Sequence, residues 1–340
     1  MNYLRIVSAT ASWLAIGGGL LVAGEPAPAA KAPHINLATS YCVDPTWPKR
    51  PKQIVWGEMP SVAIDKGDRV WVCSRVKPFV QLYDADGRFV RGWGDDVLVL
   101  PHGMRLDPEG NIWVTDARLH IVVQFTPQGK VLKTLGTRGV HGNDRTHFNM
   151  PTDVAPTPTG DVFVSDGYGN NRIVRFDRNG RFVKEWGKLG VGPGEFSVPH
   201  NIVRDAKGRL YVADRSSCRV QVFDQDGKFL DQWCNLFVPW GLCLGADGDV
   251  WVCGSSPMTW TADQLYLGCP PKDQLVMRLN PQGRVLALWM LPKGKDGKEQ
   301  AGEVNWLHGI ALDSHGNLYA ADIIGRRVQK FIKHAPDVTN

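Results

Sequence analysis

Three histidines at one position of a repeated pattern are the residues of this sequence best suited to metal chemistry. His102, His200 and His308 each stand eight residues before the glycine of a tight turn. Three neutral imidazoles that leave a fourth position open form the ligand set of a catalytic zinc, which polarises a bound oxygen or lowers the pKa of a bound hydroxyl. Iron or another divalent ion also fits, because imidazole selects weakly among these metals.

A single buried histidine is more often a hydrogen-bonded residue than a metal ligand. The shared spacing favours a common metal, because histidines placed at random would not fall at one position of alternate copies of a repeat. Other histidines have no shared spacing and are expected in surface turns or loops: His120, His141, His147 and His315. The sequence therefore predicts one metal site with three histidine ligands.

The repeat that carries these histidines is a Gly-centred turn followed by an aromatic residue. It occurs six times, at residues 66–71, 109–113, 159–163, 207–211, 247–251 and 315–319. In five copies a second glycine turn follows, at residues 84–87, 126–129, 177–180, 224–227 and 280–283. Each unit is thus a four-stranded meander, and such units at intervals of roughly 40 to 50 residues are typical of propeller blades. The predicted fold is all-β, a six-bladed β-propeller.

The last copy lacks its second turn, because residues 327–331 run almost straight into the C-terminus. We therefore expect an N-terminal strand to complete the sixth blade and remove two exposed sheet edges. Residues 53–57 are assigned to it, because their Trp-Gly ending resembles that of residues 183–187, the outer strand of copy three. The propeller is predicted to span residues 53–334, with a tail at 335–340. The alternatives, an open stack of hairpins or a sandwich, do not predict a missing final strand. An insertion in the fifth copy, residues 255–274 with Trp260 and Tyr266, is expected either to flank a ligand entrance or to have no role.

The ring geometry predicts that the three histidines meet. The innermost strand of each blade lines the central channel, so equivalent positions form a ring around its axis. Histidine occupies copies two, four and six, and alternate blades of a six-fold ring point inward about 120° apart. The equivalent positions of the other copies hold Thr152, Trp240 and either Met59 or Pro60.

The ends of the second strands carry polar groups near this site. Aspartate recurs there at positions 116, 166, 214 and 322, which favours a turn or a hydrogen bond between blades over catalysis. Arg75, Tyr168 and Arg215 depart from that pattern. Arginines near a metal suit the binding of a carboxylate, and a neighbouring cation is expected to lower the pKa of a tyrosine toward the range of a base.

The N-terminus predicts export. Arg5, an apolar stretch at 6–23 and a run of small residues at 25–30 are typical of a secretory signal peptide, here residues 1–30. The alternative is an uncleaved anchor. Residues 31–52 form an N-terminal extension, and the protein is expected to be secreted or periplasmic.

The net charge of +5 includes no block of like sign, so nucleic-acid and membrane partners are not expected. The seven cysteines are odd in number and leave at least one thiol unpaired. We expect a monomer.

Several segments resemble the peptidyl-α-hydroxyglycine α-amidating lyases, propellers built from NHL-type repeats. The similar segments are 100–103 with 110–116, 151–154 with 162–168, and 196–200 with 212–215, and the similarity is densest from 98 to 235. The resemblance implies zinc on the three histidines, Tyr168 as the base, Arg75 stabilising negative charge and Arg215 as an active-site arginine. It also implies cleavage of an α-hydroxy amide, peptidic or small, to an amide and glyoxylate without redox chemistry.

The sequence departs from that family in several places. The family holds a structural calcium in part through an acidic residue after the last zinc histidine, where this chain has Gly309, so a calcium site is not expected. Trp306 stands where the family has a methionine, and family cysteines are replaced at Gly169, Tyr211 and Val222. The hydroxylating domain of the animal enzyme has no counterpart here, which leaves other α-hydroxy amides open as substrates.

Two other functions are compatible with the same fold. One is a metal-assisted hydrolase or lactonase, although such propellers generally use oxygen-rich calcium sites rather than three histidines. The other is an NHL-type binding or scaffold module without catalysis. The fold alone does not choose among these functions.

Overall fold

The computed structural model describes residues 41–256 and 274–334. The described residues all belong to one compact unit, residues 35–340. The predicted signal peptide, residues 31–40 of the extension, Trp260 and Tyr266 of the insertion, and the C-terminal tail lie outside the described residues. Within the described ranges no helix has the length and apolar character needed to cross a membrane.

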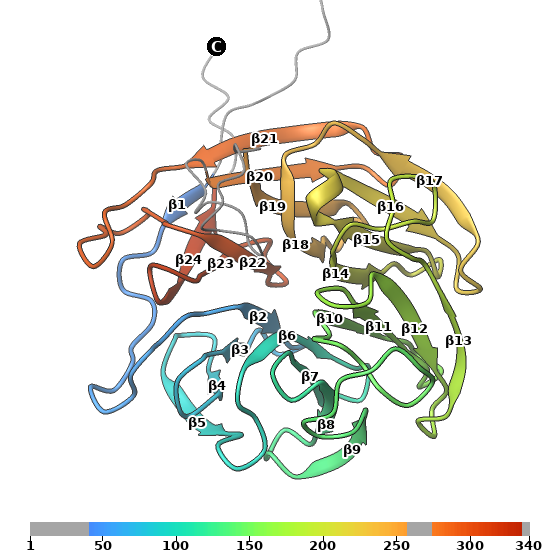
Figure 1. Cartoon of the computed structure of the whole chain (residues 1–340). Helices are drawn as coiled ribbons and strands as arrows, with labels where there is room; N and C mark the ends of the chain where they lie inside the picture. Colours follow the sequence, from blue (N-terminus) through green and yellow to red (C-terminus); the bar gives the residue numbers. More distant parts are fainter. Residues whose placement is uncertain (1–40, 257–273, 335–340) are drawn as a thin grey trace, which may run out of the picture. The chain divides into compact units, whose positions relative to one another are not determined.

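Six antiparallel sheets of four strands each surround a common centre, as predicted (Figure 1). We number these blades from the N-terminus. Blade 1 contains β2 (Ser61–Ile64), β3 (Val70–Cys73), β4 (Val80–Tyr83) and β5 (Phe89–Trp93). Blade 2 contains β6 (Pro101–Leu106), β7 (Ile112–Asp116), β8 (Ile121–Phe125) and β9 (Val131–Leu135). Blade 3 contains β10 (Asp153–Pro156), β11 (Val162–Asp166), β12 (Arg172–Phe176) and β13 (Phe182–Trp186).

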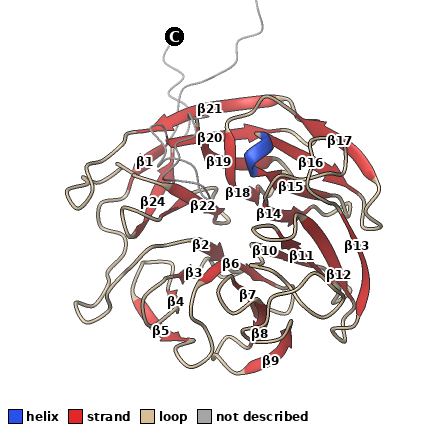
Figure 2. Ribbon diagram, viewed as in Figure 1, coloured by secondary structure: helices blue, strands red, loops and turns tan. Residues whose placement is uncertain are grey.

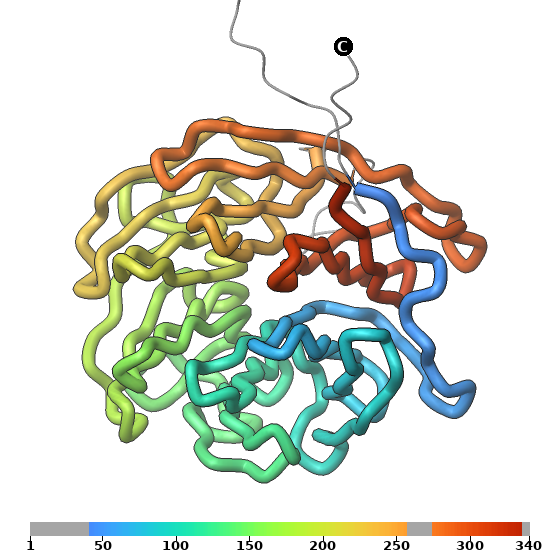
Figure 3. Tube along the Cα trace, turned by 180° about the vertical axis from the view of Figure 1, so that it is seen from behind, coloured from blue at the N-terminus to red at the C-terminus, as the bar shows by residue number. Residues whose placement is uncertain are grey.

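Blades 4 to 6 repeat the same meander. Blade 4 contains β14 (Pro199–Arg204), β15 (Leu210–Asp214), β16 (Arg219–Phe223) and β17 (Phe229–Trp233). Blade 5 contains β18 (Val238–Leu244), β19 (Val250–Ser255), β20 (Gln274–Leu279) and β21 (Val285–Leu291). Blade 6 contains β22 (Leu307–Leu312), β23 (Leu318–Asp322), β24 (Arg327–Lys333) and β1 (Tyr41–Val43). A short 3-10 helix, η1 (Arg215–Ser217), interrupts the strands after β15 (Figure 2). The first strand of each meander lies nearest the centre, which the view from behind shows equally well (Figure 3).

The aromatic residue of each repeat packs in the core between blades. These residues are at most 5% exposed: Trp71, Trp113, Phe163, Tyr211, Trp251 and Tyr319. A second contact between blades joins the outer strand of one blade to the second glycine turn of the next. The rings of Trp93, Trp186 and Trp233 occupy the space that a side chain would need at Gly129, Gly227 and Gly283, respectively. Glycine is required at these turns both for its positive φ and for this close approach.

An N-terminal strand closes the ring, as predicted, but the segment assigned to it was wrong. The sixth blade is completed by β1, in which Tyr41 pairs with Lys333 and Val43 with Phe331. Trp47 then packs on Gly87 of blade 1, as the other outer tryptophans pack on their glycines. Residues 53–57 form no strand.

The error arose because a Trp-Gly pair occurs in residues 53–57 for a different reason. Trp56 is buried, and its Nε1–H lies 2.8 Å from Oε1 of Gln81 and 2.9 Å from the hydroxyl of Tyr83. The pair therefore anchors the chain where it enters blade 1 and does not end an outer strand.

Candidate metal centre

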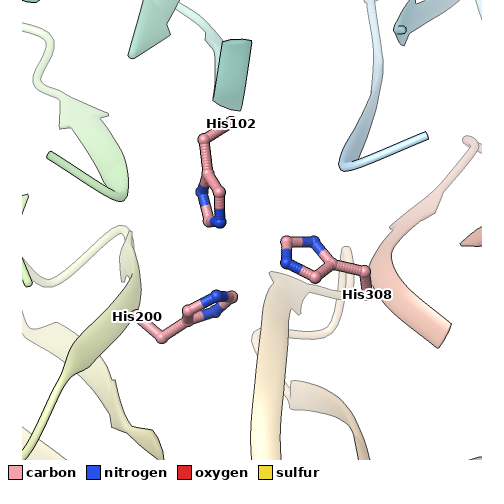
Figure 4. A group of neighbouring side chains, drawn as sticks. All are labelled: His102, His200 and His308. Carbon is pink, nitrogen blue, oxygen red and sulfur yellow. The ribbon is translucent and has the colours of Figure 1, made fainter. Parts of the chain in front are cut away.

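The structure brings the three predicted histidines together at the centre of the ring (Figure 4). One nitrogen of each ring lies within 4.8 Å of one nitrogen of each of the others, and the ring centroids are 4.8 to 4.9 Å apart. We call His102, His200 and His308 the histidine tripod. All three side chains are buried, with at most 5% exposure. Among the described residues, no other group of three or more histidines, cysteines or acidic residues is close enough to hold an ion.

Each tripod histidine stands in a β-bulge of an innermost strand. The ladder between β14 and β15 pairs Pro199 with Asp214 and then Asn201 with Ala213, so His200 has no partner. In β22 the extra residue is His308 in the same way, and in β6 the irregularity includes His102 and Gly103, which lie opposite Thr115. A bulge changes the direction of a side chain relative to the regular pleat, which lets these imidazoles reach the axis. The repeat spacing in the sequence located the histidines but did not reveal the bulges.

A backbone carbonyl of the following blade holds each imidazole in place. The Nδ1 atoms of His102, His200 and His308 lie 2.6, 2.6 and 2.7 Å from the carbonyl oxygens of Thr152, Trp240 and Pro60. A carbonyl only accepts, so Nδ1 carries the proton and donates it. Nε2 of each ring is then unprotonated and able to bind a metal, which is how metal-ligating histidines are usually oriented.

Burial keeps the tripod neutral. Loss of solvation is the main cause that lowers the pKa of all three imidazoles, and it brings that of His308 to about 3. The positive charges of Arg75 and Arg215 act in the same direction on His102 and His308. Unprotonated imidazoles are the form that binds a metal, so three Nε2 donors suit zinc or a similar transition metal better than calcium, which prefers oxygen.

Tyr168 lies directly beside the tripod. Its hydroxyl is 2.9 Å from Nε2 of His102 and 3.0 Å from Nε2 of His200. Arg215 is nearby, with its guanidinium carbon 5.6 Å from the centre of the tyrosine ring. Burial raises the pKa of Tyr168, and this effect exceeds the opposing influence of Arg215 and Arg75. The expectation of a lowered pKa from the neighbouring cations is therefore wrong for the metal-free site.

The two predicted arginines approach the tripod from different blades. Arg215, at the start of η1, is buried, and its guanidinium also lies over the ring of Trp240 at 4.9 Å. Arg75 forms an ion pair with Glu58, a residue that was not predictable from the sequence pattern because it belongs to no repeated motif. The Nε of Arg75 is buried without a hydrogen-bond partner among the described residues. The site thus presents positive charge beside the histidine tripod.

Two tryptophans form an aromatic wall on one side of the tripod. The ring centroid of Trp240 lies 5.4 Å from that of His200. The ring centroid of Trp306 lies 5.0 Å from that of Trp240 and 6.3 Å from that of His308. Trp240 donates from Nε1 to the hydroxyl of Ser255 at 2.9 Å. The Nε1 atom of Trp306 is buried and has no such partner within the described part of the chain.

The recurring aspartates hold turns, as predicted, and they also bind loops of their own blade rather than a neighbouring blade. Asp116, Asp214 and Asp322 accept hydrogen bonds from backbone N–H groups of the loop that precedes the inner strand of their own blade. They hold the loops that lead into the three histidines.

The histidines without a shared spacing lie in turns and loops, with His141 and His315 exposed. All cysteines in the described ranges are free, and Cys269 lies outside those ranges.

The sequence is similar to several characterised proteins. A family described as a 6-bladed beta-propeller matches residues 157–232. Mouse peptidyl-glycine alpha-amidating monooxygenase is 46% identical over 143 residues, which are 40% of this chain and only 15% of that protein. Human NHL repeat-containing protein 3 is 30% identical over 314 residues, covering 86% of this chain and 84% of that protein. Peptidyl-alpha-hydroxyglycine alpha-amidating lyase 1 of Drosophila melanogaster is 27% identical over 352 residues, covering 91% and 62%.

Solved structures share the fold at low sequence identity. A streptogramin B lyase superposes with a TM-score of 0.58 and 15% identity, covering 83% of this chain and 95% of the other. A gluconolactonase from Xanthomonas campestris superposes with a TM-score of 0.56 and 12% identity, covering 82% and 86%. At such identities the likeness extends to the fold alone.

Proposed function

Since this chain belongs to the NHL-repeat family of six-bladed β-propellers, we propose that it is a metal-dependent carbon–nitrogen lyase that cleaves peptidyl-α-hydroxyglycine-type substrates to an amide and glyoxylate. The proposal rests on the contact of the Tyr168 hydroxyl with Nε2 of both His102 and His200. This contact brings a hydroxyl that could transfer a proton next to the histidine tripod. Relatives named as amidating lyases support this reaction class.

The tripod is the part of the site that would hold zinc or another divalent metal, through Nε2 of each histidine. A metal bound there would supply a Lewis acid that makes a substrate hydroxyl easier to deprotonate. The residues fit this role because their Nδ1–H groups are already bonded to carbonyls and their burial disfavours protonation.

Tyr168 acts as the base in the proposed reaction. The phenolate removes the proton of the substrate α-hydroxyl, the oxygen electrons form the carbonyl of glyoxylate, and the C–N bond breaks. The departing amide nitrogen then takes a proton, which the tyrosine hydroxyl returns. The step consumes no water and no redox equivalent. The charges of Arg215 and Arg75 favour the phenolate, against the effect of burial.

Arg75 binds the substrate carboxylate in this proposal, and Arg215 has a separate role. Arg75 retains a buried Nε–H without a partner among the described residues, and guanidinium groups bind carboxylates through paired hydrogen bonds. Arg215, packed against both Tyr168 and Trp240, orients the base. We also propose export through the leader at 1–30, a monomeric protein and a small or peptidic α-hydroxy amide as substrate.

Metal content and glyoxylate release from α-hydroxyhippurate test the proposal in wild type, His200→Ala and Tyr168→Phe. We expect wild type to bind about one zinc and release glyoxylate, His200→Ala to lose both, and Tyr168→Phe to keep zinc while its rate falls by about 10²- to 10⁴-fold. Zinc binding without glyoxylate release would exclude this substrate class.

A binding module without catalysis is the second candidate. The human relative that matches over most of its length is named only for its NHL repeats. Purified protein without bound metal, and without gain of stability when zinc is added, would favour this candidate over the lyase.

A further inference from the structure

Arg105 makes an unusual set of contacts across the central channel. It stands on β6, three residues after His102, and its side chain is 17% exposed. Its Nε and Nη2 lie 3.1 and 2.6 Å from Oδ2 of Asp153, and Nη2 also donates to Oδ1 of Asn201 at 2.7 Å and to the carbonyl of Leu242 at 3.1 Å. The acceptors belong to β10, β14 and β18. One guanidinium therefore joins the inner strands of four consecutive blades.

These acceptors adjoin the groups that hold two tripod histidines. Asp153 follows Thr152, whose carbonyl accepts the Nδ1 proton of His102. Asn201 follows His200 itself, and Oδ1 of Asn201 also accepts from the backbone N–H of Leu242 at 2.9 Å.

Leu242 comes two residues after Trp240, whose carbonyl accepts the Nδ1 proton of His200. The contacts of Arg105 thus converge on the supports of His102 and His200. These are the same two histidines that Tyr168 contacts.

The charge of Arg105 is matched to a buried carboxylate. Asp153 is fully buried, and Arg105 is its ion-pair partner. Burial raises the pKa of Asp153, and the guanidinium opposes this effect. Removing only one member of a buried pair leaves an uncompensated charge and is strongly destabilising, whereas replacing both by neutral groups often is not.

We propose that Arg105 is a positioning residue that fixes His102 and His200 in the geometry required for metal binding, by tying together the strands that carry their carbonyl acceptors. The inference rests on the metal site of the proposed function. It assigns to Arg105 a role in zinc affinity, distinct from a role in stability alone. Residues that orient metal ligands typically contribute 10- to 100-fold in affinity.

Zinc affinity and thermal stability of Arg105→Met test this role, with Arg175→Met as the matched control. Arg175 also makes two hydrogen bonds to one carboxylate oxygen, of Asp161, and one to a carbonyl, but it stands on the third strand of its blade. We expect Arg105→Met to weaken zinc binding at 25 °C by about tenfold or more. Arg175→Met should lower Tm but leave the zinc Kd within about twofold of wild type, because Arg175 stands on a strand away from the tripod. The double variant Arg105→Met/Asp153→Asn should recover much of the lost Tm without recovering zinc affinity.

The outcomes separate the two proposals. A folded Arg105→Met protein with reduced Tm and wild-type zinc affinity would show a merely structural ion pair and overturn the inference. If Arg105→Met does not fold, Arg105→Lys keeps the charge without the planar fork, and wild-type zinc affinity in that variant would overturn it equally. Absence of zinc binding in the wild-type protein would instead reject the metal site, and this inference with it.

Discussion

The glycine that follows His102 provides a direct test of how tightly the inner strands must approach. A Cβ on Gly103 would lie 2.4 Å from Oδ1 of Asp153 and 2.6 Å from the carbonyl oxygen of Thr152, whereas real Cβ atoms essentially never come closer than 3.0 Å. That carbonyl is the acceptor of the His102 Nδ1 proton. Gly103→Ala must therefore separate blades 2 and 3 by roughly 0.6 Å at the metal site.

The expected cost follows from the atoms that must move. They are a backbone carbonyl and a carboxylate held by Arg105, so neither can swing aside as a flexible side chain would. Insertion of a methyl group into a packed interior costs about 1–3 kcal/mol. At about 2–4 °C per kcal/mol, Tm should fall by about 2–12 °C. Displacement of the acceptor should also weaken zinc binding about tenfold or more.

Circular dichroism melting and zinc titration measure the two effects. Gly67→Ala is the matched control, because a Cβ there has Asp65 Oδ1 as its nearest atom, at 3.5 Å, and its backbone φ is not positive. The control should leave Tm and zinc affinity unchanged. If Gly103→Ala also retains wild-type Tm and zinc affinity, the close packing of blades at the tripod is not what positions His102, and the reasoning is refuted.

Three further predictions concern the pocket wall, the pH response and ring closure. Trp306→Met should widen the site and raise kcat/KM for bulky relative to small α-hydroxy amides, and an unchanged ratio would show that Trp306 does not limit substrate size. Because the folded pKa of His308 is about 3, below the unfolded value near 6.5, the unfolded metal-free chain binds more protons between these values. Tm of the metal-free protein should therefore fall as pH decreases through this window, and His308→Gln should show a shallower slope in the same melts. Trp47→Ala should destabilise the protein by about 3–5 kcal/mol in denaturant unfolding, because its ring is buried against Gly87 and Tyr319. Val55→Ala, at a side chain 60% exposed, should change little, and equal losses in the two variants would contradict the role of Trp47 in ring closure.

The blade count and the meeting of the three histidines were predictable from the sequence. Tight glycine turns and alternating strands are local features, so each blade leaves its own signature in the chain. In a closed ring of six units, a residue at one position of alternate copies must approach the axis from three directions. Spacing along the chain was therefore enough to identify His102, His200 and His308.

The closing strand was not predictable in the same way. A three-residue strand such as Tyr41–Val43 has too few positions to show alternation, and its pairing with β24 depends on residues nearly the whole chain away. The Trp-Gly pair at 56–57 was a stronger local signal, but its tryptophan is used inside blade 1.

Only the tertiary structure decided the properties that depend on distances between strands and on the exclusion of water. The bulges at the histidines, the carbonyls that accept their Nδ1 protons and the contacts of Arg105 join different blades, and no local pattern encodes them. The direction of the pKa shift of Tyr168 belongs with them, because charge alone predicted a decrease and burial reversed it. The sequence by itself determined which groups the centre contains. Their protonation and orientation were set by packing, because solvation energies and hydrogen-bond geometry exist only once the blades enclose them.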